Sequence, residues 1–336
     1  MTTHRLRTAD DLELHVSVHG PADAPLTVLL AHCWTADEDD WHYQTRAVLS
    51  RYGHGIRLLT WDHRGHGRSE AAPEAACTIA HLTRDLGAVV DAFAPTGPLL
   101  VAGHSIGGMV MTAIPEERPD LVPRIRGLLF VSTSAGELDG VTLGFPEATA
   151  PLVRAQLPRM LATRARILSR SKRLSQPVTE RRVVRHFLFG RPRRLRDTGL
   201  VVDQLINCPP ATMSGFVHDF MTHERAAGLA AYAGIPATVL VGTRDLLTPP
   251  PHARRLARHL PGARLLVAPE AGHMLPLERD ELVSTELCRL IDSALATRGA
   301  RVSAAPARAD QDRAPRDLHP VDRDGDVRVV QAPAGP

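Results

Sequence analysis

The chain of 336 residues has almost no lysine, few aromatic residues and no long apolar run. Lys172 is its single lysine and Asn207 its single asparagine, a bias that indicates a GC-rich genome more than selection for guanidinium chemistry. Aromatic residues make up 4%, which excludes a broad aromatic binding platform. No apolar run reaches the roughly 18 to 20 residues of a membrane-crossing helix, so no membrane span is predicted. The N-terminus has no apolar segment typical of a secretory signal, which predicts a cytoplasmic location.

Several binding signatures are also missing. The four cysteines are far apart in the sequence, without CxxC or Cys/His spacing, and indicate neither a disulfide framework nor a zinc site. Neither a phosphate-binding loop nor a dinucleotide-binding glycine motif is present, and no HExxH accompanies the histidines, so we predict no metal and no cofactor. The net charge of +3 argues against nucleic acid. The expected partner is a small molecule, and the sequence does not indicate an oligomeric state.

Short apolar runs alternate with helical patterns, the order typical of βα units around a mostly parallel sheet. Alternating apolar residues from Leu12 to Val18, behind the turn signal Asp10-Asp11, predict an antiparallel hairpin at the sheet edge. Buried strands are predicted at 26–31, 56–61, 99–102, 128–131, 238–241 and 265–268. Helices are predicted at 41–51, 78–93, 107–117, 251–259 and 280–296. The sequence thus indicates an α/β fold.

The alternation stops within residues 137–224, where the pattern is helical and rich in arginine. We interpret this stretch as a helical lid inserted between two parts of one α/β core, residues 1–136 and 225–298. Residues 151–200 hold 14 basic side chains against two acids, Glu180 and Asp197. A solvated outer face explains this excess most simply, and contact with an anionic substrate or a membrane surface is the alternative.

Residues 299–336 consist largely of Ala, Pro, Arg and Asp, with no aromatic residue. Such a segment cannot bury enough apolar surface to fold alone, so we predict a disordered tail. The alternative is a partner-binding segment around Asp326 to Val330.

The segment LLVAGHSIGGMVM, residues 99–111, carries the strongest chemical signal. A buried strand leads into Gly103-His104-Ser105-Ile106-Gly107 and then a helix, the context in which G-x-S-x-G forms a nucleophile elbow. Gly103 and Gly107 remove Cβ atoms that would collide in the tight turn. The hypothesis is that Ser105 is a nucleophile at a helix N-terminus, where a developing anion is stabilised.

A serine nucleophile needs a base and an orienting carboxylate. Asp245 follows the strand at 238–241, and His273 follows the strand at 265–268. Both therefore fall at the edge where open α/β sheets place their sites. The chain order Ser, Asp, His predicts a triad of Ser105, Asp245 and His273.

Attack by Ser105 on a carbonyl also requires an oxyanion hole. One donor is expected to be the backbone N–H of Ile106, the residue after the nucleophile. The second is expected from the loop His32-Cys33-Trp34 after the first buried strand, and we favour the N–H of Trp34.

Five segments together resemble the α/β-hydrolase superfamily, in its lidded serine-esterase-like branch. They are HCW at 32–34, WDHRGHGRS at 61–69, GHSIGG at 103–108, GTRDLLTP at 242–249 and GHMLPLE at 272–278. The resemblance implies an eight-stranded, mostly parallel sheet with flanking helices and a helical lid. It also implies that Ser105 is the nucleophile, that His273 is general base and acid, and that Asp245 fixes the tautomer of His273.

Two positions depart from the family pattern. Relatives usually carry His-Gly where this chain has His32-Cys33, so Cys33 is either a bystander packed behind the loop or a reactive thiol near the pocket. Ser132, Thr133 and Ser134 occupy the place of an aspartate after the strand at 128–131. This favours Asp245 over Glu137 or Asp139 as the third triad member.

The leading hypothesis is a serine hydrolase that cleaves a carboxylic ester or similar activated acyl compound. The same fold also supports hydrolysis of thioesters, lactones and C–C bonds, and cofactor-free perhydrolase or lyase chemistry. A third alternative is a binding protein that has lost turnover. Candidates to line an apolar pocket for a small to medium acyl group are Trp34, Phe145, Met213, Phe216 and Phe220, although several of these could be plain lid core.

Overall fold

A computed structural model describes residues 1–141, 148, 152, 156, 178–303 and 330–331. Its strands are β1 (Thr2–Arg7), β2 (Glu13–His19), β3 (Thr27–Ala31), β4 (Arg57–Trp61), β5 (Leu99–His104), β6 (Ile125–Val131), β7 (Ala237–Gly242), β8 (Arg264–Ala268) and β9 (Val330–Gln331). They form one sheet in the order β1-β2-β4-β3-β5-β6-β7-β8-β9. Pairing is antiparallel from β1 to β2 and from β2 to β4, and parallel in every other neighbouring pair. The mostly parallel sheet and its edge hairpin are confirmed.

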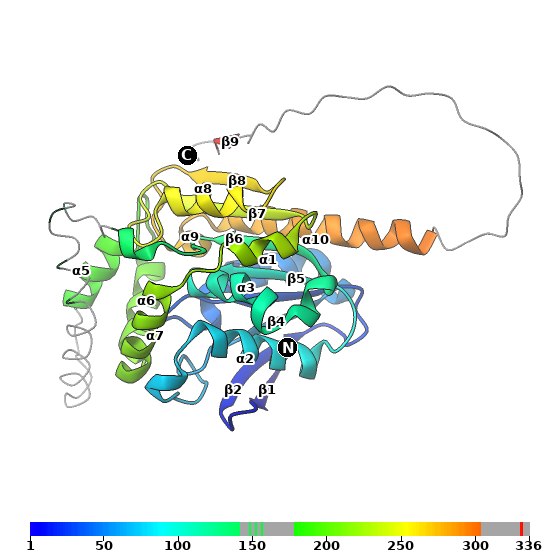
Figure 1. Cartoon of the computed structure of the whole chain (residues 1–336), viewed down its shortest axis with the longest axis horizontal. Helices are drawn as coiled ribbons and strands as arrows, with labels where there is room; N and C mark the ends of the chain where they lie inside the picture. The colour runs from blue at the N-terminus through cyan, green and yellow to red at the C-terminus, as the bar shows by residue number, and fades with distance from the viewer. Residues whose placement is uncertain (142–147, 149–151, 153–155, 157–177, 304–329, 332–336) are drawn as a thin grey trace, which may run out of the picture.

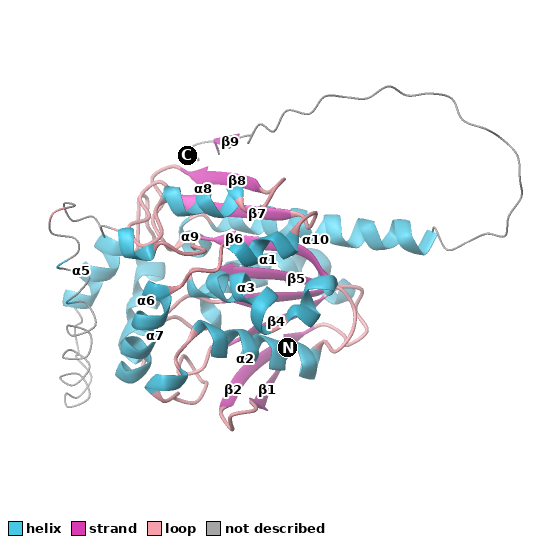
Figure 2. Ribbon diagram, in the orientation of Figure 1, coloured by secondary structure: helices cyan, strands magenta, loops and turns pink. Residues whose placement is uncertain are grey.

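Helices cover both faces of this sheet (Figures 1 and 2). Outside the inserted segment they are α1 (His42–Tyr52), α2 (Ile79–Phe93), α3 (Ile106–Glu117), α8 (Pro250–Arg258), α9 (Leu275–Glu278) and α10 (Asp280–Ser303). One apolar cluster joins the sheet to α2, α3 and α8, and another joins it to α1 and α10. Strands β3 and β5 are buried along their whole length, as continuous apolar runs between two helical layers require. Among the described residues, no helix has the length and apolar character needed to cross a bilayer.

The inserted segment, residues 137–224, contains α5 (Val178–Phe187), α6 (Leu195–Asn207) and α7 (Pro210–Thr222). Figure 1 shows these helices together at one end of the sheet. Val184, Phe189 and Val202 from this segment pack with Cys33 and Met274, which follow β3 and β8. The segment therefore contacts the loops at the carboxyl ends of the strands.

The C-terminal boundary differs from the sequence prediction. Helix α10 continues to Ser303, five residues beyond the expected end of the core at 298. Val330 and Gln331 pair in parallel with Leu266 and Val267 of β8, which adds a ninth strand to the eight expected. The composition of residues 299–336 did not indicate this pairing, because a strand of two residues at the edge of a sheet needs no apolar core of its own. The rest of the proposed tail lies outside the described residues.

Candidate active site

Ser105 lies in the turn between β5 and α3, with backbone angles φ 54° and ψ −114°. The neighbouring glycines make this left-handed turn possible. A Cβ on Gly103 would approach the carbonyl carbon of Gly107 to 2.4 Å, and a Cβ on Gly107 would approach the Ala31 oxygen to 2.2 Å. The Ser105 N–H donates to the Val131 oxygen at 2.9 Å, which ties the turn to β6. The strained geometry expected for a nucleophile elbow is present.

Asp245 and His273 form a buried pair beyond the ends of β7 and β8. Nδ1 of His273 lies 3.0 Å from each carboxylate oxygen of Asp245. The hydroxyl of Thr248 and the N–H groups of Leu247 and Thr248 also donate to this carboxylate. Burial alone would raise the pKa of Asp245, but His273 and the Thr248 hydrogen bonds outweigh burial and lower it. The carboxylate therefore stays ionised and fixes Nδ1 as the protonated ring nitrogen of His273.

His104, the residue before Ser105, lies next to His273. The His104 ring, adjacent to Ser105 in sequence, has its centroid 5.2 Å from that of His273. No hydrogen bond joins the Ser105 hydroxyl to the His273 ring among the contacts of the described residues. Such bonds are commonly long in proteins without substrate and shorten when one binds.

Trp34 and Ile106, the residues expected to supply backbone N–H donors, border the same cavity as Ser105. Neither donates to a protein acceptor within the described part of the chain. The N–H of Cys33, in contrast, donates to Asp40 at 3.1 Å. Of the loop expected to supply the second donor, Trp34 thus has an N–H available and Cys33 does not.

The cavity next to Ser105 has a volume of about 90 Å³ and is almost entirely apolar. It is lined by Trp34, Ser105, Ile106, Met109, Leu138, Val141, Phe220, Met221, Leu247 and Thr248. Two of the five residues predicted to line a pocket, Trp34 and Phe220, are on this wall, with ring centroids 5.2 Å apart. Phe145 lies outside the described residues.

Met213 and Phe216 are buried but are not on the cavity wall, which corrects the prediction made for them. They share one face of α7 with Phe220, as the spacing indicates. That face is about 10 Å long from Met213 to Phe220 at 1.5 Å per residue. The Phe216 ring packs against His66, with centroids 5.6 Å apart, so only the C-terminal end of the helix reaches the cavity.

Cys33 is packed behind the loop. It is buried and belongs to the apolar cluster between the inserted segment and the core. Burial, and then the nearby Asp40 carboxylate, raise the pKa of its thiol well above the usual value. Its backbone is not left-handed, whereas Thr35 in the same loop has φ 65°, so the family glycine is not required at position 33. These observations favour a bystander over a reactive thiol.

Cys33, Asp40 and His104 place a thiol, a carboxylate oxygen and a ring nitrogen within 4.8 Å of one another. The arrangement does not fit a metal ion as it stands, because His104 Nδ1 and Asp40 Oδ2 already share a hydrogen bond of 2.7 Å. The thiol is also held in its neutral form, which is not a ligand form.

The inserted segment is bonded directly to the loop that carries His273. The Leu188 oxygen accepts the N–H groups of His273 at 2.8 Å and Met274 at 3.2 Å. Glu278 accepts the N–H groups of Gly190 at 2.6 Å and Gly272 at 3.0 Å. The sequence did not point to Asp40, His104 or Glu278, although they lie within or beside the motifs. Asp40 and His104 pair across 64 residues of the chain, and Glu278 accepts backbone N–H groups, which residue type does not reveal.

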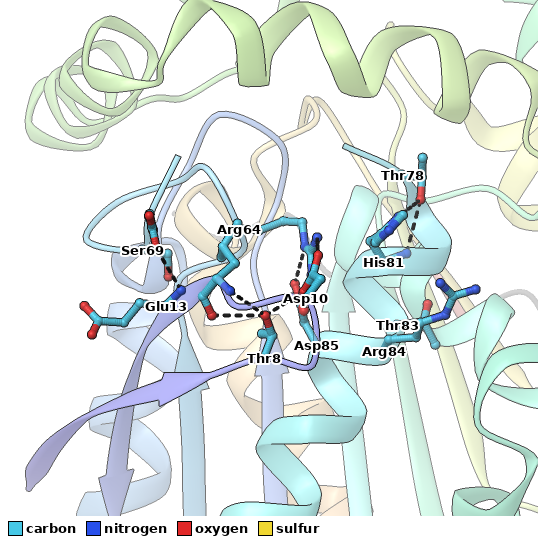
Figure 3. A network of polar contacts seen from close by, with 12 residues as sticks. Thr8, Asp10, Glu13, Arg64, Ser69, Thr78, His81, Thr83, Arg84 and Asp85 are labelled. Carbon is cyan, nitrogen blue, oxygen red and sulfur yellow. Dashed lines mark hydrogen bonds and ion pairs between the residues drawn. The ribbon is translucent and has the colours of Figure 1, made fainter. Parts of the chain in front are cut away.

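The DHRGHGRS segment, residues 62–69, has a structural role. Asp62 accepts the N–H groups of Glu38 and Arg68, each at 2.8 Å. Arg64 is fully buried and pairs with Asp85 and Asp10, at 2.6 and 2.7 Å (Figure 3). This network fastens the turn to α2 and to the hairpin loop, away from Ser105.

Comparison with known proteins agrees with this geometry. The family described as the alpha/beta hydrolase family matches residues 28–286. A Mycobacterium tuberculosis protein with the provisional name non-heme bromoperoxidase BpoC is 30% identical over 75% of this chain and 88% of its own length. Rhodomycin D methylesterase DnrP of Streptomyces peucetius is 27% identical over 84% of this chain and 96% of its own. The structure of a Thermogutta terrifontis esterase superposes with a TM-score of 0.69 at 22% identity, covering 88% of this chain and 99% of that one.

Proposed function

The chain belongs to the alpha/beta hydrolase family, and on this basis we propose that it is a serine hydrolase that cleaves carboxylic esters through an acyl-Ser105 intermediate. The observation that carries the proposal is the buried Asp245–His273 pair beside the strained turn of Ser105. A hydroxyl becomes a useful nucleophile only when an oriented base accepts its proton. The relative named as a methylesterase is consistent with ester chemistry.

In this mechanism the Ser105 oxygen attacks the carbonyl carbon while Nε2 of His273 takes the hydroxyl proton. The tetrahedral intermediate collapses, and His273 passes that proton to the departing alcohol. Water then attacks the acyl-serine, again with His273 as base, and the acid leaves as Ser105 regains its proton. Asp245 keeps the proton on Nδ1 throughout and stabilises the imidazolium that forms twice in the cycle.

The N–H groups of Trp34 and Ile106 would stabilise the negative oxygen of both tetrahedral intermediates. Both residues lie beside Ser105, and neither N–H donates to a protein acceptor in the described part of the chain. Ile106 also begins α3, where the helix dipole favours negative charge. Preorganised donors of this kind commonly contribute about 10²- to 10³-fold each to the rate.

We further propose that the preferred substrate has a small apolar acyl group. The wall next to Ser105 consists mostly of apolar side chains such as Trp34, Met109, Val141 and Phe220, and none of the described residues that line it is charged. A charged acyl chain would lose its hydration there without gaining a partner. The arginines of α5 and the loop after it border a separate hollow instead.

The deciding experiment is active-site labelling with a fluorophosphonate, comparing wild type with Ser105→Ala. We expect stoichiometric labelling that the substitution abolishes, together with hydrolysis of p-nitrophenyl acetate and butyrate. Labelling that persists in Ser105→Ala would refute Ser105 as the nucleophile. A panel of acyl chain lengths, with one thioester and one lactone, then separates ester hydrolysis from its alternatives.

Perhydrolysis is the second candidate, because a relative bears the name of a non-heme bromoperoxidase. Here hydrogen peroxide replaces water as the nucleophile toward acyl-Ser105, and the product is a peracid. Oxidation of bromide by the released peracid, measured with acetate and peroxide present, tests this reaction. It should disappear in Ser105→Ala as ester hydrolysis does.

A further inference from the structure

Asp40 and His104 form a hydrogen-bonded pair in the interior behind the proposed triad. Nδ1 of His104 is 2.7 Å from Oδ2 of Asp40, and both side chains are completely buried. Asp40 belongs to the short helix Glu38–Trp41 after the Cys33–Trp34 loop, and His104 ends β5 directly before Ser105. The pair therefore spans two of the segments from which the proposed site is built.

Each nitrogen of the His104 ring faces an acceptor. Nε2 lies 2.9 Å from the main-chain oxygen of His273, and a carbonyl oxygen can only accept. An ionised carboxylate can also only accept, so Nδ1 must carry a proton as well. With a proton on both nitrogens, His104 is an imidazolium. The other possibility is a neutral pair, with the proton on Asp40.

A third contact favours the charged form. Oδ2 of Asp40 also accepts the Cys33 N–H at 3.1 Å, so two donors converge on one carboxylate oxygen. Oδ1 has no hydrogen-bond partner in the described part of the chain, and a proton placed there would have no acceptor. One carboxylate thus connects the loop before Trp34 with the imidazole that holds His273.

Few titratable groups among the described residues face His104. They are Asp40 on one side, the His273 and Asp245 pair on the other, and His32 and Cys33 from the loop after β3. Burial lowers the pKa of His104, but the Asp40 charge and the hydrogen bonds to Asp40 and His273 outweigh burial and raise it. Burial lowers the pKa of His32 and raises that of Cys33, so both neighbours are neutral.

We propose that Asp40 and His104 form a buried ion pair that positions the proposed catalytic groups, holding the His273 main chain through Nε2 and the oxyanion loop through the Cys33 N–H. The inference rests on the proposed function, because it assigns these residues to the same site. They are positioning residues, since neither borders the cavity where substrate would bind.

The protonation state can be measured without any substrate. In ¹⁵N-labelled full-length protein, long-range ¹H–¹⁵N spectra at pH 7 should show both nitrogens of one histidine in the protonated range, and this signal should be absent from His104→Gln. We expect this doubly protonated signal to persist at pH values above those at which an exposed histidine loses its proton. A His104 ring with one unprotonated nitrogen at pH 7 would overturn the ion pair. So would stoichiometric zinc that occupies this nitrogen in the purified protein.

The positioning role is tested by Asp40→Asn and His104→Gln. Each should lower kcat by about 10²-fold, because His273 is displaced from its position beside Ser105. KM should change little, because neither Asp40 nor His104 borders the cavity. Unaltered kcat in both variants would overturn the proposal.

Asp85→Asn is the matched control. It breaks the Arg64–Asp85 ion pair, which is equally buried but lies outside the site. Thermal unfolding should show a loss of stability, while kcat stays close to wild type. If this control lowers kcat as much as Asp40→Asn does, the effect of Asp40→Asn is only structural and the proposal fails. Failure of the proposed function is seen separately, as fluorophosphonate labelling that does not depend on Ser105, whereas the NMR result stands without turnover.

Discussion

Glu278 accepts the Gly272 N–H with both carboxylate oxygens, at 3.0 and 3.1 Å. One of these oxygens also accepts the Gly190 N–H at 2.6 Å, so a single partly buried carboxylate joins the inserted segment to the loop of His273. Burial raises the pKa of Glu278 from its ordinary value of 4.5 to about 7, although the two N–H groups lower it. This side chain should therefore titrate in the folded protein near neutral pH.

The first prediction concerns the pH dependence of stability. The folded state binds the Glu278 proton more strongly than the unfolded state, so its contribution is full below pH 4.5 and is lost as pH rises through about 7. The shift corresponds to about 3 kcal/mol. Urea unfolding across this range should show that rising pH costs wild type stability that Glu278→Gln does not lose, so the difference in unfolding free energy between the two proteins changes by about this amount. Glu270→Gln, an exposed neighbour, should keep the wild-type slope, and an equal slope in all three proteins would contradict the assignment.

A second prediction separates Asp245 from Glu137, the nearby acid that the sequence left as an alternative. Asp245→Asn should lower kcat by about 10⁴-fold, because the amide no longer fixes the proton on Nδ1 of His273. Glu137→Gln should leave kcat close to wild type, since Glu137 is exposed and pairs with Arg255 at 3.1 Å. Steady-state hydrolysis of p-nitrophenyl butyrate measures both. Comparable losses in the two variants would remove Asp245 from its proposed role.

The third prediction concerns acyl chain length. Phe220→Ala should enlarge the cavity beside Ser105 and shift the preference in kcat/KM toward longer acyl chains. Met213→Ala removes a buried side chain from the same helix that does not border the cavity, and should leave the preference unchanged while lowering stability. Each truncation is expected to cost about 2 to 4 kcal/mol of stability. A shift of the same size in both variants would mean that the cavity does not select the acyl chain.

The sequence was sufficient to predict the sheet, the order of its parts and the positions of Ser105, Asp245 and His273 at strand ends, because these depend on local patterns. It did not reveal Glu278 or Asp40. Glu278 and Asp40 accept backbone N–H groups of Gly190, Gly272 and Cys33, and a main-chain donor leaves no mark in residue type. The other partner of Asp40 is the His104 ring, 64 residues away in the chain, and no local pattern pairs the two. The sequence also did not show which end of α7 borders the cavity, because periodicity identifies an apolar face but not what each part of that face contacts.

A fourth prediction concerns the thiols. All four cysteines are free and buried, and burial raises the pKa of each. Native protein should therefore react slowly with dithionitrobenzoate at pH 8, and four thiols should appear on unfolding. Cys33→Ala should remain active and lose about 1 kcal/mol of stability, since its N–H still donates to Asp40. Rapid modification of Cys33 in the native protein, with loss of activity, would instead favour a reactive thiol at the pocket.

The last prediction concerns acid stability, where His66 acts in the opposite sense to Glu278. Its Nδ1 donates to the Arg64 oxygen at 3.0 Å, and Nε2 has no partner in the described part of the chain. Burial lowers the pKa of His66 from 6.5 to about 4. The unfolded state therefore takes up this proton first, and stability is lost as pH falls from 6.5 toward 4, by about 3 kcal/mol.

Unfolding free energies of His66→Gln measured over this range should fall less steeply toward acid than those of wild type, while His54→Gln, an exposed histidine, should follow wild type. Because Glu278 gains stability over nearly the same interval in which His66 loses it, the two slopes partly cancel in wild type. Glu278→Gln should consequently lose stability faster than wild type on acidification, and His66→Gln should lose it more slowly. If both variants instead change the slope in the same direction, at least one of the two residues titrates differently from what its burial implies.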